Sequence, residues 1–105
     1  MLNETDLIEL TKETLPARVA ALTSAEIAWL VDLLAEKNDK IRYGAFLLLN
    51  ERSLSFADVF PYWDVFAGKL SSDNSYQRSI GVMLLAVNTR WDKEDKTASV
   101  LDAYL

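Results

Sequence analysis

The chain has 105 residues, of which 50% are hydrophobic and 26% are charged, a balance typical of one globular domain. It contains no cysteine and no histidine, which excludes disulfide bonds, thiolate or imidazole metal sites and histidine-based catalysis. The net charge of −5 argues against a nucleic-acid-binding surface. No apolar run reaches the roughly 18 residues of a membrane span and no signal-peptide pattern opens the chain, so we expect a cytoplasmic protein.

The first 22 residues are expected to form an N-terminal cap. With only 3 Gly and 2 Pro, and without an Asn-Gly or Asp-Gly pair, the sequence favours helices over hairpins. A first helix is expected to begin near Asn3. Pro16 is expected to break it, because proline lacks a donor and disfavours helical geometry at the preceding residue. Residues 1–22 are either one or two capping helices or a degenerate repeat.

Residues 24–51 predict a first helix pair. Thr23 and Glu26 have the spacing of a capping box at the start of the first helix. The polar stretch EKNDK ends that helix, and residues 39–51 predict a second helix that is apolar nearly all round. The first helix carries an apolar stripe at helical spacing, consisting of Ile27, Leu30, Val31 and Leu34.

Residues 55–90 predict a second helix pair. Ser55 and Asp58 have the spacing of another capping box, and Pro61 lies within the helix expected to follow. A further apolar helix is expected at about residues 75–89 and a last helix at residues 92–105, which makes about five or six helices in an all-α fold. The expected apolar face of the helix after Ser55 includes Phe56, Val59, Phe60, Trp63, Phe66, Ala67 and Leu70.

The two helix pairs repeat one another at an offset of 36 residues. Asn38 matches Asn74 and Arg42 matches Arg78 at this offset, and each pair has a small residue three positions after the arginine. These small residues, Ala45 and Gly81, would allow close helix packing. A helix pair repeated at this spacing is typical of an α-solenoid.

The segments IRYGA (41–45) and QRSIG (77–81) carry a resemblance to a known family. They resemble the Val-Arg-x-x-Ala opening of the second helix in HEAT repeats, and Pro61 lies where that family often kinks its first helix. The first pair lacks the proline, and Asp39 and Asp73 are not equivalent. The resemblance covers about residues 24–90 and implies a short right-handed α-solenoid of the armadillo-like class. It also implies that Arg42 and Arg78 are mainly structural, pairing with acids or carbonyls.

One stripe along the second helices is a candidate recognition surface. Tyr43, Leu47 and Asn50 have the spacing i, i+4, i+7, and Ser79 and Met83 are repeat equivalents. Arg90 continues this line. If this side faces outward, its composition suits a peptide or helix of another protein. If it does not, the stripe packs against the first or last helix.

The chain carries no P-loop, dinucleotide-binding or nucleophile-elbow motif, and we expect neither catalysis nor a cofactor or metal. The predicted function is a non-catalytic protein-interaction or scaffold module. An alternative is a DNA-binding HEAT-like protein, similar in fold type to bacterial DNA alkylation repair glycosylases, in which Arg42, Arg78, Arg90 and Trp91 would face DNA. Self-association through the terminal helices is a third hypothesis, because a short solenoid has unshielded ends.

Overall fold

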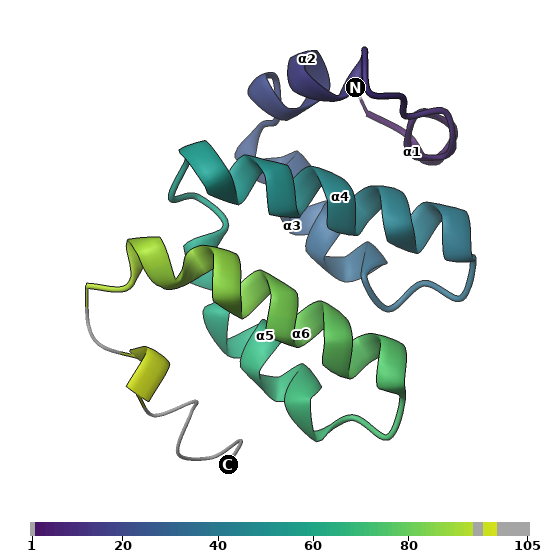
Figure 1. Ribbon diagram of the computed structural model, residues 1–105. Helices are drawn as coiled ribbons and strands as arrows, with labels where there is room; N and C mark the ends of the chain where they lie inside the picture. Colours follow the sequence, from purple (N-terminus) through teal and green to yellow (C-terminus); the bar gives the residue numbers. More distant parts are fainter. Residues whose placement is uncertain (1, 94–95, 99–105) are drawn as a thin grey trace. The chain divides into compact units, whose positions relative to one another are not determined.

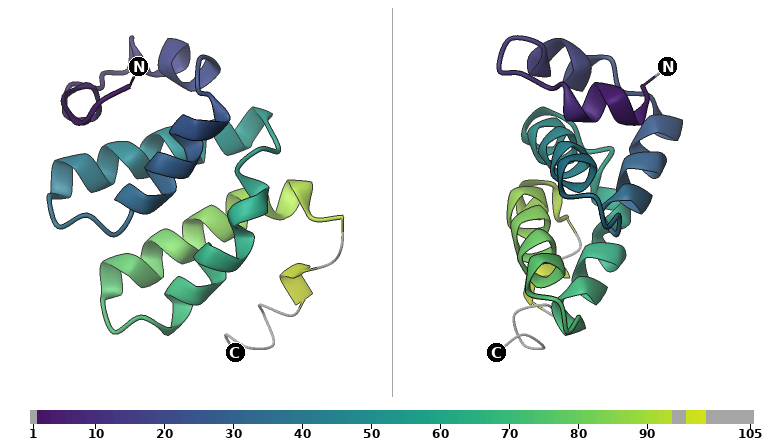
Figure 2. Two further views of the ribbon diagram at one scale, coloured as in Figure 1. Left: turned by 180° about the vertical axis from the view of Figure 1, so that it is seen from behind. Right: turned by 90° about the vertical axis from the view of Figure 1, so that its right-hand side faces the viewer.

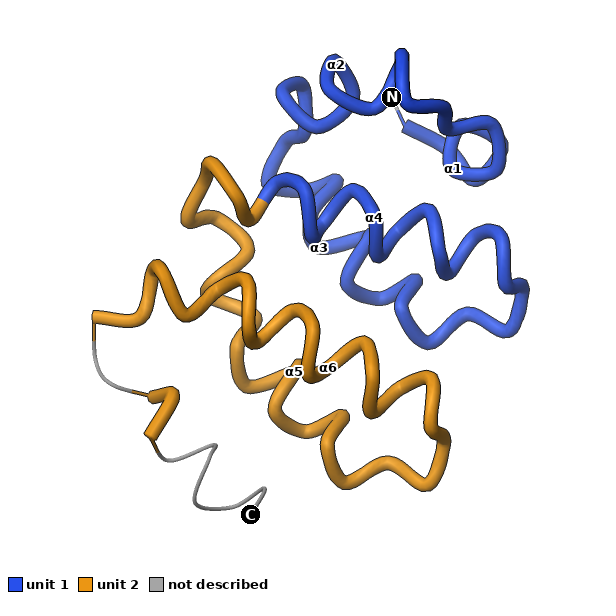
Figure 3. Tube along the Cα trace, in the orientation of Figure 1, with its two compact units in different colours: residues 1–52 blue, residues 53–105 orange. Residues whose placement is uncertain are grey.

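The structure, a computed structural model, describes residues 2–93 and 96–98 (Figure 1). Every regular element in these residues is a helix and no strand occurs in them, which confirms the predicted all-α class. The chain divides into two compact units, residues 1–52 and residues 53–105 (Figure 3). None of the described helices combines the length and apolar character needed to cross a membrane.

The first unit begins with two short helices, α1 (Glu4–Ile8) and α2 (Leu15–Ala20). Asn3 caps α1, because its Oδ1 accepts from the N–H of Asp6 at 3.0 Å while Asp6 Oδ2 accepts from the N–H of Asn3 at 2.9 Å. Pro16 lies in the first turn of α2, where a missing N–H leaves no helical bond unmade. A separate helix thus begins next to Pro16, but the first helix already ends at Ile8, so the expectation that Pro16 ends it is wrong.

Helices α3 (Ser24–Leu33) and α4 (Asp39–Ser55) follow as an antiparallel pair (Figure 2). The predicted capping box at the start of α3 is confirmed: Thr23 Oγ1 accepts from the N–H of Glu26 at 3.2 Å, and Glu26 Oε1 accepts from the N–H of Thr23 at 3.0 Å. Helix α4 continues to Ser55, past the expected end at residue 51. The predicted stripe of Ile27, Leu30, Val31 and Leu34 is buried.

Helix α4 has a wide buried face. Ala45, Leu48 and Leu49 are fully buried. Gly44 lies one turn before Leu48 on this face, and an added Cβ there would stand 2.7 Å from the carbonyl oxygen of Leu7 in α1. The absence of a side chain at Gly44 therefore lets α1 approach the backbone of α4 closely.

The second unit differs from the sequence prediction where its first helix begins. The capping box expected at Ser55 and Asp58 is wrong, because Ser55 is the last residue of α4. The next helical residues form a 3-10 turn, η1 (Phe60–Tyr62), followed by α5 (Trp63–Gly68) and the 3-10 turn η2 (Lys69–Ser71). Pro61 lies in the first turn of η1, where its missing donor is tolerated. Phe56 is 40% exposed rather than on an apolar face, whereas Val59, Trp63 and Phe66 are buried as expected.

Helix α6 (Ser75–Asn88) packs against α5 and η2 (Figure 2). Ile80, Leu84 and Leu85 are buried, and an added Cβ at Gly81 would stand 2.7 Å from the carbonyl oxygen of Phe66. The small residue expected at position 81 therefore serves contact between α6 and α5.

A 3-10 turn, η3 (Thr89–Trp91), follows α6 and contacts the last turn of α4. Trp91 Nε1 donates to the carbonyl oxygen of Ser53 at 2.7 Å, and Arg90 Nη1 donates to that of Leu54 at 3.0 Å. Of the last helix expected at residues 92–105, residues 96–98 are helical, and Asp92 Oδ1 accepts from the N–H of Lys96 at 2.9 Å. The rest of that expected helix lies outside the described residues.

Candidate functional site

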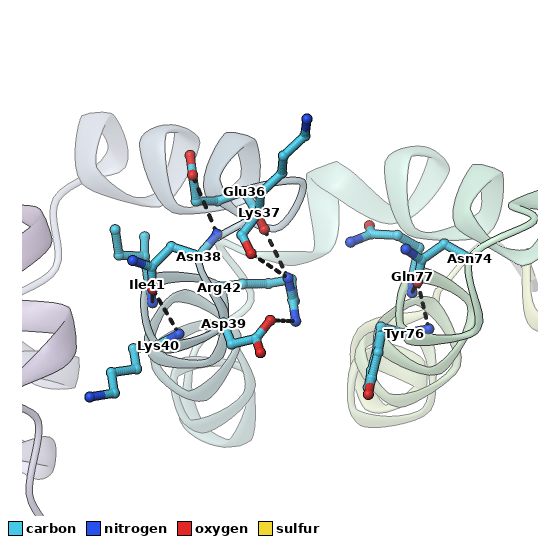
Figure 4. A network of polar contacts seen from close by, with 10 residues as sticks. All are labelled: Glu36, Lys37, Asn38, Asp39, Lys40, Ile41, Arg42, Asn74, Tyr76 and Gln77. Carbon is cyan, nitrogen blue, oxygen red and sulfur yellow. Dashed lines mark hydrogen bonds and ion pairs between the residues drawn. The ribbon is translucent and has the colours of Figure 1, made fainter.

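The N-terminal ends of α4 and α6 are built in the same way, each within its own unit. Asn38 Oδ1 accepts from the backbone N–H groups two and three residues later, at 3.0 and 3.2 Å. Asn74 Oδ1 does the same, at 2.8 and 3.2 Å (Figure 4). An asparagine cap satisfies helix N–H groups that otherwise lack a partner. Asn38 and Asn74, which match at the repeat offset, therefore have the same local role: each caps the second helix of its pair.

The matched arginines each hold the loop before their helix. Arg42 Nη1 donates to the carbonyl oxygen of Glu36 at 3.0 Å, as Figure 4 shows. Arg78 Nη1 donates to the carbonyl oxygen of Ser72 at 2.8 Å, again six residues earlier. Both arginines thus fix a tight connection between two helices of one pair.

The two arginines differ in their negatively charged partners. Arg42 Nη2 lies 2.5 Å from Asp39 Oδ1, at the first residue of α4. The equivalent first residue of α6 is Ser75, which carries no charge. Within the part of the chain that the structure describes, Arg78 has no carboxylate partner, and its side chain is exposed. Its positive charge is therefore not compensated by an ion pair there.

An open hollow lies on the exposed face of α6 around Arg78. Arg78 is the only charged residue of this helix, so the hollow is locally positive in a chain of net charge −5. Val82 and Met83, which lie about one turn after Arg78, are 40% and 44% exposed. The hollow therefore has a polar, cationic end and an apolar end. Its lining residues are Ser75, Arg78, Ser79, Val82 and Met83.

The structure brings together two of the three partner-binding residues predicted on the second pair. Ser79 and Met83 line the hollow, whereas Arg90 does not. Arg90 is exposed, and its Nε and Nη1 donate to the carbonyl oxygens of Val87 and Leu54, each at 3.0 Å. The guanidinium of Arg90 therefore satisfies helix-end carbonyls in its own unit.

The sequence prediction missed Ser75 and Val82 as lining residues. A single stripe at i, i+4, i+7 covers a narrow line, whereas the exposed face of a helix is wider. Ser75 lies four positions before Ser79 and Val82 lies three positions after it, so helical spacing could have found both.

The predicted residues of the first pair lie on α4, in the other unit. Tyr43 is 62% exposed, while Leu47 and Asn50 are half-buried. Tyr43 therefore presents most of its ring to solvent, and an exposed tyrosine provides both apolar area and a hydroxyl for recognition. Ala45, the predicted structural position on this helix, is fully buried.

Two titratable groups have clearly shifted pKa values. The N–H groups of Leu2 and Thr23 donate to the carboxylate of Glu26 and hold its pKa below the ordinary value. Burial lowers the pKa of Lys69, whose Nζ donates to Gln77 Oε1 at 2.7 Å. Among the described residues, no group of three or more acidic side chains is arranged to hold a metal ion.

Comparisons with known proteins do not assign a function to these residues. No family model matches the sequence, no curated protein matches it, and no solved structure matches the chain. The candidate site is therefore defined by the α6 hollow and by the repeated construction of the two helix pairs.

Proposed function

We propose that this chain is a non-catalytic protein-binding module built from HEAT-like helix pairs of a short right-handed α-solenoid. The observation that carries the proposal is the exposed apolar pair Val82 and Met83 in the hollow beside Arg78. Exposed apolar side chains gathered beside polar groups are typical of protein-recognition surfaces. Each unit would present its own surface to another protein, the exposed face of α6 in the second unit and that of α4 around Tyr43 in the first.

The repeated local construction supports the solenoid part of the proposal. Asn38 and Asn74 cap their helices alike, and Arg42 and Arg78 bond to equivalent loop carbonyls at an offset of 36 residues. Solenoid proteins repeat one supersecondary unit several times. The same capping and loop-bracing hydrogen bonds are therefore expected in successive helix pairs.

The chemistry of the chain supports a binding rather than a catalytic role. The sequence has no histidine and no cysteine, the residues that most often serve as general bases and thiol nucleophiles. The two groups with clearly shifted pKa values have a structural explanation, because backbone N–H groups of Leu2 and Thr23 bond to Glu26 and burial lowers the pKa of Lys69. The exposed face of α6 is then best explained as a surface that binds a partner.

The test is affinity capture with the full chain from an extract of the source cells. The triple variant Tyr43→Ala/Leu47→Ala/Met83→Ala removes the proposed contact side chains from both units. Val65→Ala is the control, because Val65 is 46% exposed on α5 and belongs to neither proposed face. We expect the triple variant to lose a partner that both the wild type and the control retain. Retention of every partner by the triple variant would contradict the proposal.

A further inference from the structure

We propose that the α6 hollow binds a protein segment in which a carboxylate lies close to an apolar side chain. The carboxylate would pair with Arg78, and the apolar side chain would contact Val82 and Met83. The inference rests on the proposed function and names the chemistry of the partner.

The first step of the argument is the missing acid beside Arg78. In the first pair, Asp39 supplies a carboxylate to Arg42, whereas the equivalent position in the second pair is Ser75. The loop-bracing bond to a carbonyl is made in both pairs, at 3.0 and 2.8 Å. That bond uses one of the five N–H donors of the Arg78 guanidinium. Arginine presents paired donors that match the two oxygens of a carboxylate, so an external carboxylate can take the place that Asp39 takes beside Arg42.

The second step is the distance between the charged and apolar ends of the hollow. Arg78 and Val82 are four residues apart on α6, an axial separation of about 6 Å. An extended strand covers about 3.3 Å per residue, and a helix rises about 1.5 Å per residue. A matching partner therefore has its acidic and apolar residues two positions apart if extended, or four positions apart if helical.

The third step is the selectivity of the surroundings. Arg78 is the only charged residue of α6, and Ser75 and Ser79 beside it carry hydroxyls that can donate to a carboxylate oxygen. A basic segment would meet repulsion from Arg78, and a purely apolar one would leave the guanidinium without a charged partner. The hollow therefore favours an acidic–apolar segment over both.

The probes are fluorescein-labelled ten-residue peptides that contain Glu followed by Leu at a spacing of two or four positions. Each peptide has a twin with Gln in place of Glu and another with Lys. Binding to the full chain is measured by fluorescence anisotropy. Chemical shifts of the Val82 and Met83 methyl groups report where on the protein a peptide binds.

Ser75→Asp is the decisive variant, because it restores the acid that the first pair has. An aspartate at the first position of α6 suits the helix N-terminus, so the variant should fold. It would pair with Arg78 internally and compete with the peptide. Ser75→Asn is the matched uncharged control, and Arg78→Gln removes the positive charge directly.

We expect the Glu peptides to bind the wild type and the Ser75→Asn control alike. Binding should weaken about tenfold or more for Ser75→Asp, for Arg78→Gln and for the Gln twin, as expected for loss of a charge-assisted pair. Equal binding of the Glu and Gln peptides, or undiminished binding to Ser75→Asp, would overturn the inference while leaving a protein-binding hollow intact. Failure of every peptide to bind would also overturn it, and the capture experiment would then judge the proposed function separately.

Discussion

Gly44 lies directly against Leu7: a Cβ atom at position 44 would stand 2.7 Å from the carbonyl oxygen of Leu7 and 2.9 Å from its Cβ. A Cβ cannot approach a backbone oxygen so closely without a shift of the backbone. Gly68 is different, because nothing lies within 4 Å of the Cβ it would gain. Helix packing therefore requires a residue without a side chain at position 44 but not at position 68.

Gly44→Ala should lower the free energy of unfolding by about 1–3 kcal/mol. The clash with Leu7 is a form of overpacking, and it outweighs the higher helix propensity of alanine. Gly68→Ala is the control and should leave stability unchanged or raise it by up to about 1 kcal/mol. Urea denaturation of both variants checks the prediction, which fails if the two shift stability equally.

Arg52→Met should be strongly destabilising. Arg52 is buried, and its Nη1 donates to the carbonyl oxygens of Val19 at 2.9 Å and Ala20 at 3.4 Å, at the end of α2. Loss of hydrogen bonds from a charged donor costs about 1.5–3 kcal/mol, and the carbonyls at the end of α2 would lose this partner. Thermal and chemical denaturation measure the effect.

Arg18→Met provides the comparison for Arg52. Arg18 Nη2 lies 3.2 Å from Asp6 Oδ1, but the Arg18 side chain is 45% exposed, so the loss should stay within about 1 kcal/mol. A larger loss for Arg18→Met than for Arg52→Met would show that burial does not determine the importance of these arginines.

Glu26→Gln should reduce the pH dependence of stability in acid. The N–H groups of Leu2 and Thr23 hold the pKa of Glu26 below its ordinary value of 4.5. Since the folded-state pKa is the lower one, its stabilising contribution is fully present above pH 4.5 and is lost as the pH falls through the folded-state pKa. The variant should be less stable at neutral pH and lose less stability below pH 4.5. If the free energy of unfolding of the variant and of the wild type fell equally with pH below 4.5, the prediction would be wrong.

Asn88→Asp should have the opposite pH dependence. Asn88 is fully buried; its Nδ2 donates to Leu84 O at 2.8 Å and to Ser53 Oγ at 3.2 Å, and its Oδ1 has no partner among the described residues. An aspartate there would be a buried charge facing a carbonyl, which raises its pKa and costs about 3 kcal/mol or more at neutral pH. Because this folded-state pKa is raised, the deficit should shrink as the pH falls.

Urea denaturation at neutral and mildly acidic pH measures the change caused by Asn88→Asp. Asn50→Asp, at a half-buried position on α4, is the control and should show a much smaller deficit. A deficit for Asn88→Asp that does not depend on pH would show that the loss of stability does not come from burying a charge.

Local sequence signals predicted the helix starts where no distant contact competed with them. The Thr23–Glu26 capping box is formed as expected, and Pro16 lies in the first turn of a helix, where proline is tolerated. The Ser55–Asp58 pattern has the same spacing but failed, because Ser55 is the last residue of α4 and the next helical residues begin at Phe60. Arg52 in this last part of α4 bonds to Val19, a contact 33 residues away that a local pattern cannot reveal.

The candidate site was predictable in part. The repeat at an offset of 36 pointed to Ser79 and Met83, which line the hollow, but not to the charge of Arg78, which has no carboxylate partner among the described residues. A signal existed in the sequence, because both pairs have i, i+3 spacing but only Asp39 and Arg42 carry the opposite charges of a helical ion pair, whereas Ser75 offers Arg78 no charge. The bond that directs Arg90 to Leu54 depends on a contact between distant segments and could not be predicted locally.

The bond from Trp91 Nε1 to the carbonyl oxygen of Ser53 joins residues 38 positions apart. It brings the point where the chain enters the second unit next to the point where α6 and η3 end. Segments whose ends meet can be inserted or duplicated with little disturbance of the flanking chain. Residues 53–91 therefore begin and end at neighbouring points within their own unit, which makes this segment suited to transfer into a loop of another protein.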